Sequence, residues 1–269
     1  MSTTGKHTTT DGTSLFTRAW PHEDPIGTVL LVHGVSEHTG RWGHVAEFLV
    51  AEGFEVFGFD QRAHGESGDG ILDIEDFTLF VDDVADMMAA VRTEGRPLIL
   101  YGHSMGGLIS VLHAVSAHPE PDLIVLSAPA LVAEVPAPLR LAANVLGRFA
   151  PKLAMATAVE KAHLSRDPDV GEAYVNDPLV YLKGTTRFGR LLFAAMDRAR
   201  GAISRIKTPT LVVHGADDKL VPPRASAALA GVEAVERRVF PGLRHEMHNE
   251  PESAEVLGFI SRWVKAHLK

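Results

Sequence analysis

Three polar side chains that lie far apart in the sequence could together activate a serine. Ser104 is the central residue of residues 102–106 (Gly-His-Ser-Met-Gly), which match the pattern G-x-S-x-G. A serine hydroxyl is a weak nucleophile near neutral pH, so it needs a base to accept its proton and a third group to orient that base. An acid in residues 214–222 and a histidine in residues 241–245 follow in the order serine, acid, histidine. The pattern predicts nucleophilic chemistry at Ser104.

Two positions of this constellation have a rival. Asp218 directly precedes residues 219–222 (Lys-Leu-Val-Pro), and we favour it as the acid over Asp217, which would then be a solvated loop carboxylate. His245 is the expected base, with His248 as the alternative. The two histidines could also ligate a metal, but Glu246 does not complete an H-E-x-x-H zinc helix and no third ligand is indicated. We therefore expect neither a metal nor a cofactor.

Attack by a serine on a carbonyl creates an oxyanion, which needs preorganised hydrogen-bond donors. The backbone N–H of Met105, directly after the serine, is one expected donor. The second should come from the loop after an earlier strand, where residues 33–35 are His-Gly-Val. We expect the N–H of Val35 to be this donor, with Gly34 leaving the turn unhindered.

The apolar pattern of the chain predicts the elements that must position these residues. Apolar runs, typical of strands buried on both faces of a parallel sheet, occur at residues 28–32, 98–101, 123–126 and 210–213, and further strands are expected at residues 54–59 and 236–240. Helices are expected between them, including one from about residue 74 to 93 and a terminal one from about 252 to 268. Residues 7–10 and 15–19 flank Asp11-Gly12 and predict an edge hairpin. The class is therefore α/β, with a mostly parallel central sheet and helices on both faces.

This alternation stops between Pro129 and about Arg205, which is far longer than an ordinary connection. We predict a core formed by residues 1–128 and 206–269, interrupted after the sixth strand by a helical cap at residues 129–205. Within the cap, apolar residues recur at helical spacing: Leu139, Ala142, Val145, Leu146 and Phe149. Such a face packs on the core in most proteins, and the alternative is that it meets an acyl chain or a membrane.

Composition excludes several classes of function. The 269 residues carry a net charge of −8 and contain no cysteine. The negative charge argues against a nucleic-acid partner, and the lack of cysteine excludes disulfides and thiolate catalysis. The first residues are polar, without an apolar signal core, and no apolar run approaches the roughly 20 residues that span a bilayer. We therefore expect a cytoplasmic protein without a transmembrane segment.

Four motifs taken together are more specific than the serine motif alone. They are residues 33–38 (His-Gly-Val-Ser-Glu-His), 60–67 (Asp-Gln-Arg-Ala-His-Gly-Glu-Ser), 102–107 (Gly-His-Ser-Met-Gly-Gly) and 245–250 (His-Glu-Met-His-Asn-Glu). Over nearly the whole chain this set resembles the monoacylglycerol lipase branch of the α/β-hydrolase family, which also includes lysophospholipase-like esterases. Ser36 and Ala63 stand where that family commonly has glycine, so we expect altered loop geometry but not lost activity.

The resemblance implies roles for individual residues. It implies a catalytic triad of Ser104, Asp218 and His245, with Val35 and Met105 as the oxyanion pair. It also implies that Glu37, Arg41 and His248 line a polar pocket for the glycerol end of a substrate, and His103 is a further candidate for that pocket. A carboxylate and a guanidinium can meet neighbouring hydroxyls as acceptor and donor, but a surface ion pair is the alternative for Glu37 and Arg41.

The activity implied is hydrolysis of a monoacylglycerol ester to a free fatty acid and glycerol, without a cofactor. The triad alone does not distinguish this from a lysophospholipase or a broad carboxylesterase, because specificity lies in the cap and pocket. A different class of function is a non-catalytic protein that binds a lipophile on a hydrolase scaffold. Family members with mobile caps associate with lipid surfaces, which implies transient contact of the cap with lipid here.

Overall fold

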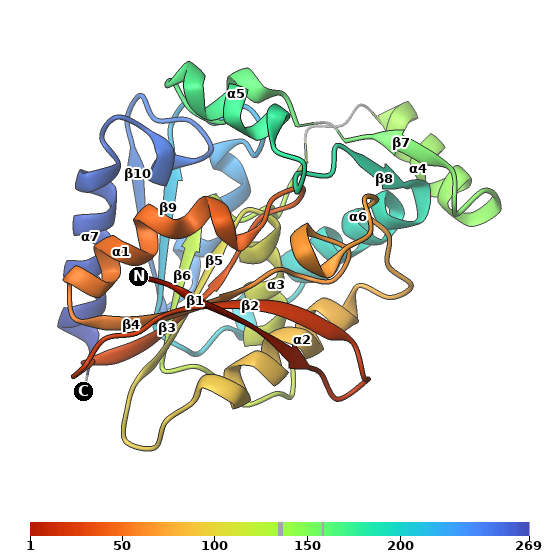
Figure 1. The fold of residues 1–269 in the computed structure, drawn as a ribbon. Coiled ribbons are helices and arrows are strands. Elements are labelled where there is room, and N and C mark those ends of the chain that lie inside the picture. Colours follow the sequence, from red (N-terminus) through yellow and green to blue (C-terminus); the bar gives the residue numbers. More distant parts are fainter. Residues whose placement is uncertain (134–136, 158, 269) are drawn as a thin grey trace.

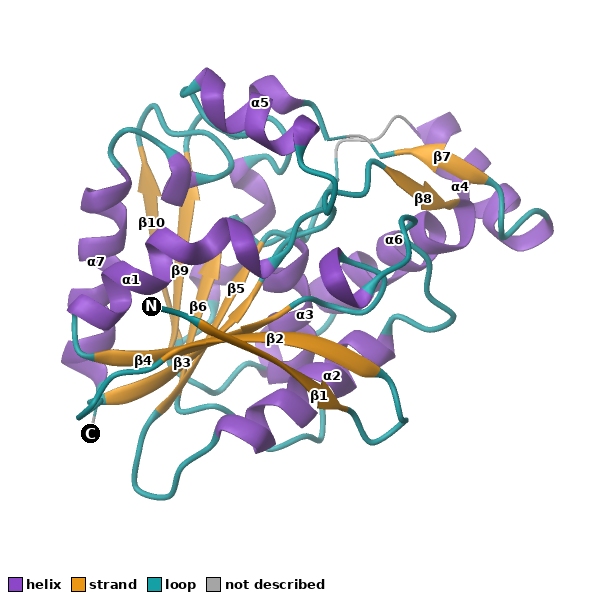
Figure 2. Ribbon diagram, viewed as in Figure 1, coloured by secondary structure: helices purple, strands orange, loops and turns teal. Residues whose placement is uncertain are grey.

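The computed structural model describes residues 1–133, 137–157 and 159–268 of the chain. At its centre lies an eight-stranded sheet in the order β1-β2-β4-β3-β5-β6-β9-β10 (Figures 1 and 2). The strands are β1 (Thr3–Thr8), β2 (Ser14–Trp20), β3 (Gly27–Val32), β4 (Phe54–Phe59), β5 (Leu98–His103), β6 (Leu123–Ser127), β9 (Thr210–Gly215) and β10 (Val235–Phe240). From β4 to β10 all neighbours are parallel, and β1 and β2 add an antiparallel edge.

Helices cover both faces of this sheet, as the apolar runs predict. The long helices of the core are α1 (Gly43–Ala51), α2 (Thr78–Val91), α3 (Met105–Ala114) and α7 (Ser253–His267). Alternate side chains of one strand enter two separate cores: Leu30 and Leu100 pack with α2 and α3, whereas Leu31 and Ile99 pack with α1 and α7. Because each strand is buried on both faces, it has to be apolar at successive positions.

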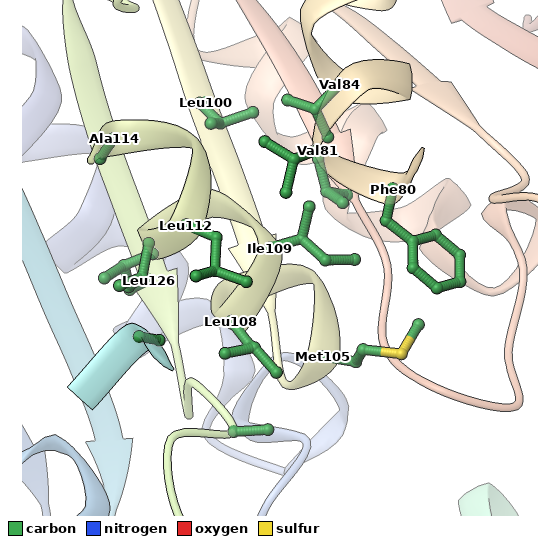
Figure 3. Close-up of a cluster of buried hydrophobic side chains, with 14 of the residues drawn as sticks. Phe80, Val81, Val84, Leu100, Met105, Leu108, Ile109, Leu112, Ala114 and Leu126 are labelled. Atoms are coloured by element: carbon green, nitrogen blue, oxygen red, sulfur yellow. The ribbon is translucent and has the colours of Figure 1, made fainter. Parts of the chain in front are cut away.

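Figure 3 shows the core beneath α3, the helix that follows Ser104. Leu108, Ile109 and Leu112 are buried against α2 and the sheet, together with Phe80. The side chain of Met105 belongs to the same core and is buried at the first position of the helix. Burial of this first turn fixes the start of α3, and therefore the backbone around Ser104, relative to the sheet.

The segment between β6 and β9 contains the predicted insertion. Its elements are α4 (Ala137–Phe149), β7 (Ala154–Ala156), α5 (Pro168–Asn176), β8 (Lys183–Thr185) and α6 (Thr186–Arg200). β7 and β8 form a separate antiparallel pair. Short 3₁₀ helices complete the chain: η1 (Thr39–Trp42), η2 (Gly65–Ser67), η3 (Lys161–His163), η4 (Ile203–Arg205), η5 (Pro223–Gly231) and η6 (Met247–Asn249). In Figure 1 the segment between β6 and β9 extends beyond one end of the sheet, with α5 above β9 and β10.

The apolar stripe of α4 does not pack against the core where the structure describes its side chains. Val145 is 47% exposed and Phe149 is 79% exposed, and Leu141 beside them is 65% exposed. The reason is the opposite face of the helix, where Gly147 is buried so closely against α6 that a Cβ would overlap the backbone of Thr186. Gly147 therefore faces the protein, whereas Val145 and Phe149 face outward, Ala142 is exposed and Leu146 is half-buried. The side chain of Leu139 lies outside the described residues.

Most predicted elements agree with the structure, with shifted ends. The hairpin around Asp11-Gly12 is confirmed, and Gly12 has the left-handed φ of 87° that such a turn requires. The helix expected from about residue 74 begins at Thr78 instead, because the carboxylate of Asp76 accepts the N–H of Thr78 and ends the preceding loop. Among the described helices, none is long and apolar enough to cross a bilayer.

Candidate active site

Ser104 lies at a sharp turn between β5 and α3. Its φ of 52° and ψ of −115° are unfavourable for a residue with a side chain, and such strain is typical of functional sites. The turn requires glycine on both sides: a Cβ on Gly106 would overlap the carbonyl oxygen of Val32, and one on Gly102 would overlap that of Gly106. The N–H of Ser104 donates to the carbonyl of Ser127 at 2.9 Å. The strained turn therefore holds the hydroxyl above the carboxyl end of the sheet.

The structure brings the serine, the histidine and one aspartate into direct contact. The hydroxyl of Ser104 lies 2.9 Å from Nε2 of His245, and Nδ1 of His245 lies 2.7 Å from Oδ2 of Asp218. Oδ1 of Asp218 accepts the backbone N–H groups of Leu220 and Val221, each at 2.9 Å. With a proton on Nδ1, His245 donates to the aspartate and accepts from the serine, which is the arrangement that a general base needs.

Asp218 and not Asp217 faces His245. Asp217 is exposed, whereas the side chain of Asp218 is buried and also lies 3.3 Å from Nε2 of His214. Burial raises the pKa of Asp218, but the charge of His245 and the hydrogen bonds from His214, His245 and Val221 outweigh it, so the net pKa lies well below its usual value. For His245, burial lowers the pKa. The charge of Asp218 and its hydrogen bond outweigh this effect, so the net pKa of His245 is raised.

The loop after β3 lies against the serine. A Cβ on Gly34 would lie 3.2 Å from Cβ of Ser104, so the loop could not approach as closely with a larger residue. Val35 and Met105 both line the cavity into which Ser104 opens. The N–H of Gly34 donates to a carboxylate oxygen of Glu37, which holds this loop in place. The two residues expected to supply the N–H donors therefore line the same cavity as Ser104.

Both departures from the family motifs fall on left-handed backbone. Ser36 has a φ of 57° and Ala63 a φ of 61°. Glycine adopts this conformation freely, whereas other residues are strained in it. A glycine at either position would adopt the same φ without strain, whereas Ser36 and Ala63 keep this conformation at a cost in strain.

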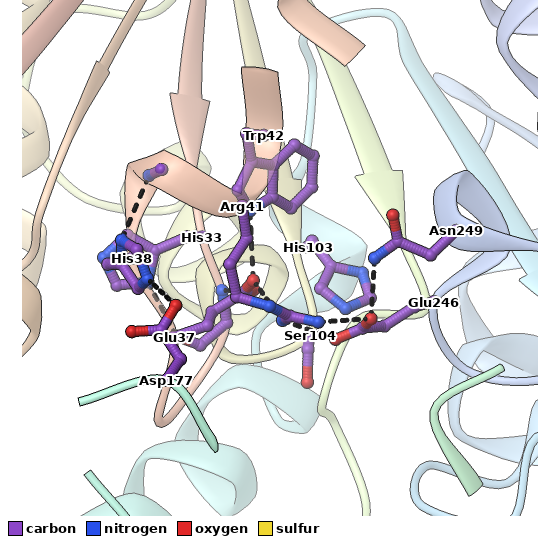
Figure 4. Close-up of polar contacts among 12 residues, drawn as sticks. His33, Glu37, His38, Arg41, Trp42, His103, Ser104, Asp177, Glu246 and Asn249 are labelled. Atoms are coloured by element: carbon purple, nitrogen blue, oxygen red, sulfur yellow. Dashed lines mark hydrogen bonds and ion pairs between the residues drawn. The ribbon is translucent and has the colours of Figure 1, made fainter. Parts of the chain in front are cut away.

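Beside the serine lies a buried network of charges (Figure 4). Arg41 donates to Glu37 at 3.0 Å and to both carboxylate oxygens of Glu246 at 2.8 Å. The indole N–H of Trp42 donates to Glu37 at 3.1 Å, and the amide of Asn249 donates to Glu246 at 2.7 Å. Arg41 thus links the loop that contains Val35, the expected oxyanion donor, to the loop that contains His245.

Burial sets the charges within this network. It raises the pKa of Glu37 above its ordinary value, although the charge of Arg41 opposes the shift. For Glu246 burial acts in the same direction, but the charge and hydrogen bonds of Arg41 prevail and lower the pKa. The guanidinium also lies 4.9 Å from the ring centre of Tyr174, which α5 contributes. Glu37 and Arg41 do form an ion pair, but the expectation of a surface pair is wrong, because their side chains are only 3% and 11% exposed.

The candidates for a glycerol pocket do not all reach the cavity. Glu37 and His103 line it, whereas Arg41 and His248 are not among the lining residues. His248 is buried behind the site, stacked on Trp42 with 4.3 Å between ring centres, and neither of its ring nitrogens has a hydrogen-bond partner among the described residues. Burial lowers the pKa of His103 and that of His248 well below the ordinary value for histidine. Both are therefore neutral near pH 7.

Two functional neighbours were not predicted as site residues. Tyr174 lines the cavity from α5, and no local pattern marks it. Glu246 lies inside the motif of residues 245–250, where its spacing from the two histidines served only as an argument against zinc. The signal available was its position directly after the histidine. Among the described residues, no group of three or more histidines and carboxylates could hold a metal ion.

The cavity above Ser104 has a volume of about 290 Å³. Part of its lining consists of the polar residues described above. The rest is apolar and comes largely from the segment between β6 and β9, with these side chains among others: Val132, Met155, Val159, Phe188, Leu192 and Met196. The cavity thus combines the nucleophile and a few polar side chains with a mostly apolar lining.

The parallel sheet, the strained serine turn and the Ser–His–Asp contacts define an α/β-hydrolase. A family model described as serine aminopeptidase, S33, matches residues 23–252, and the chain belongs to this hydrolase family.

Relatives of the chain are named as lipases. The monoacylglycerol lipase of Mycolicibacterium smegmatis is 37% identical over 256 residues, which cover 92% of this chain and 91% of that protein. The monoglyceride lipase of Homo sapiens is 31% identical over 266 residues, with 94% and 88% covered. The solved structure of Paleococcus ferrophilus monoacylglycerol lipase is 32% identical, with a TM-score of 0.83 and 94% and 99% covered.

Proposed function

We propose that the protein hydrolyses the ester bond of monoacylglycerols to a free fatty acid and glycerol. The observation that carries this proposal is the chain of contacts from Ser104 to His245 and Asp218, because Ser104 and His245 line a cavity whose other walls are mostly apolar. The relatives named as monoacylglycerol and monoglyceride lipases support it. No cofactor takes part in the proposed reaction.

The proposed reaction has two halves. Oγ of Ser104 attacks the ester carbonyl while Nε2 of His245 takes the serine proton, and the N–H groups of Val35 and Met105 stabilise the oxyanion. The intermediate collapses to an acyl-enzyme, and His245 gives its proton to the departing glycerol oxygen. Water then attacks the acyl-enzyme with His245 as base, which releases the fatty acid and restores Ser104. Asp218 keeps the imidazolium oriented throughout.

The charges of the cavity favour a neutral alcohol over a phosphate as the leaving group. Among the described residues that line it, Glu37 and Glu246 are the acidic side chains and no lysine or arginine is present. The guanidinium of Arg41 is already held by the same two carboxylates. A phosphodiester would meet these carboxylates without a free cation, so the observations favour monoacylglycerol over a lysophospholipid.

We propose that Glu37 and His103 contact the glycerol end directly, because both line the cavity. Arg41 then acts by holding Glu37 and Glu246, and His248 by supporting Trp42 and His103. We also propose that residues 129–205 act as the cap of the site, since this segment supplies most of the apolar lining. The acyl chain would lie against that lining.

The outer face of the cap suits transient contact with a lipid surface. Leu141, Val145, Phe149 and Met155 are exposed there, and Met155 also lines the cavity. A substrate could therefore pass from lipid into the site along apolar surface. Replacing Leu141 and Phe149 by glutamate should abolish sedimentation with vesicles, while the same change at Ile26, which is exposed on the core, should leave it intact. Equal sedimentation of both variants would contradict the proposal.

A panel of substrates tests the proposed activity. We expect kcat/KM to be highest for monoacylglycerols and lower for a lysophospholipid, a short-chain ester, and di- and triacylglycerols. A higher value for the lysophospholipid would favour a lysophospholipase, and a preference for the short-chain ester would favour a broad carboxylesterase. A non-catalytic lipophile-binding protein would show no turnover and no labelling of Ser104 by a fluorophosphonate.

A further inference from the structure

Glu250 has a buried carboxylate that accepts hydrogen bonds from two different segments of the chain. Its side chain is 0% exposed. Oε1 accepts the backbone N–H of Arg244 at 2.7 Å, and Oε2 accepts the backbone N–H and Nε–H of Arg166 at 3.1 and 3.0 Å. Arg244 directly precedes His245, whereas Arg166 belongs to the segment between β6 and β9. One carboxylate therefore joins residues 244–246, which we call the histidine loop, to the cap.

The same two segments meet at four further hydrogen bonds. The guanidinium of Arg244 donates to the carbonyls of Ala162 and Ser165 at 2.6 and 2.8 Å. In the opposite direction, the hydroxyl of Ser165 donates to the carbonyl of Asn249 at 2.9 Å. The N–H of Glu246 donates to the carbonyl of Leu164 at 2.8 Å. The backbone on both sides of His245 is thus held, on one side by Glu250 and on the other by the cap.

We propose that Glu250 is a positioning residue that, with Arg166, couples the cap to the orientation of His245. The inference rests on the proposed function, because it assigns Glu250 a part in the work of the same histidine. The two contacts of His245 span 2.9 and 2.7 Å, so a small rotation of its backbone would break one of them. A movement of residues 162–166 is transmitted to the imidazole through the buried carboxylate.

The charge of Glu250 is needed because all three of its contacts are donated to it. Glu250→Gln keeps the size of the side chain but turns an NH₂ group toward at least one N–H group, which repels it. Glu252 is a matched control. It also pairs with Arg166, but its side chain is 46% exposed, and no contact to residues 244–246 is among its hydrogen bonds or ion pairs. Glu252→Gln therefore removes a charge from the same arginine without touching the histidine loop.

The experiment compares Glu250→Gln and Glu252→Gln with the wild type on a 4-nitrophenyl acyl ester, with active sites counted by a fluorophosphonate. We expect kcat per titrated site to fall about tenfold in Glu250→Gln with KM unchanged, since a misplaced catalytic group costs up to about 100-fold. Glu252→Gln should stay within about twofold of the wild type. The low-field NMR proton between His245 and Asp218 should shift or broaden in Glu250→Gln and remain in Glu252→Gln.

A purely structural role for Glu250 predicts a different result. It would lower the melting temperature but leave kcat per titrated site and the low-field proton unchanged, and that outcome overturns the inference. If Glu250→Gln does not fold, Arg166→Ala decides, because its side chain is 36% exposed. We expect a fall in kcat there too, and an unchanged kcat would overturn the inference. Hydrolysis of the 4-nitrophenyl ester without hydrolysis of monoacylglycerol would refute the proposed substrate and leave this test valid.

Discussion

Replacing Arg41 by methionine should destabilise the protein strongly and in a pH-dependent way. Arg41 lies between Glu37 and Glu246, whose side chains are each 3% exposed. Methionine fills much of the same volume but leaves two carboxylates buried without a cation. Removing one partner of a buried ion pair typically costs about 3–5 kcal/mol, and we expect a loss in this range in the free energy of unfolding at pH 8.

The pH dependence follows from the two carboxyl groups. Without Arg41, burial raises the pKa of Glu246 in the folded state above its value of about 4.3 in the unfolded chain. A carboxyl with a raised pKa destabilises the fold only where it is ionised, so the loss is small below about pH 4 and grows as the pH rises through the folded pKa. A tenfold difference in proton affinity between the folded and unfolded chains corresponds to about 1.4 kcal/mol. Between pH 8 and pH 5 the loss should therefore shrink by about 1.4 kcal/mol for each pH unit over which the folded chain binds one proton more than the unfolded chain.

Urea denaturation of the wild type and Arg41→Met at pH 5 and pH 8 measures both quantities. The double variant Arg41→Met with Glu246→Gln should recover part of the loss at pH 8, because it removes one uncompensated charge. Arg92→Met is a matched control, since Arg92 pairs with Asp122 at the surface at 3.6 Å, and such pairs are worth about 0–1 kcal/mol. An equal loss at both pH values would refute the reasoning.

Three further outcomes are expected. Ser104→Ala should abolish turnover and fluorophosphonate labelling while leaving the melting temperature near that of the wild type, and residual activity near the wild-type rate would exclude the mechanism. The kcat/KM value should rise with pH through a midpoint above the usual histidine pKa of about 6.5, because Asp218 raises the pKa of His245. Asp218→Asn should lower both that midpoint and kcat, and an unchanged midpoint would contradict this assignment. Ala63→Gly should raise the free energy of unfolding by about 1 kcal/mol in urea titrations by relieving a left-handed φ, and a decrease would show that no strain is present there.

The α/β fold could be predicted because its signals are local. An apolar run of six residues such as Gly27–Val32 fits a strand that is buried on both faces, whatever the rest of the chain does. The order of Ser104, Asp218 and His245 along the chain was equally readable, since each follows a predicted strand at the same edge of the sheet. The preference for Asp218 over Asp217 agrees with where the structure places the two side chains.

Whether the apolar face of α4 points toward the protein or toward solvent could not be predicted in the same way. Periodicity shows that Val145 and Phe149 share a face, but not what lies opposite that face. The close approach of α6 to Gly147 decided it, and that contact joins residues about forty positions apart. The same limit applies to Tyr174, which reaches the cavity only through the position of α5.

The sequence by itself determined the type of sheet, the chemistry of the nucleophile and the residues available to assist it, because periodicity and motif spacing are properties of neighbouring positions. Only the tertiary structure decided that Arg41 is held between two buried carboxylates, that His248 does not line the cavity, and that Glu250 accepts hydrogen bonds from both Arg166 and Arg244. These contacts depend on how segments separated by up to about two hundred residues pack against each other. Their energies come from burial and from partners that no local pattern specifies.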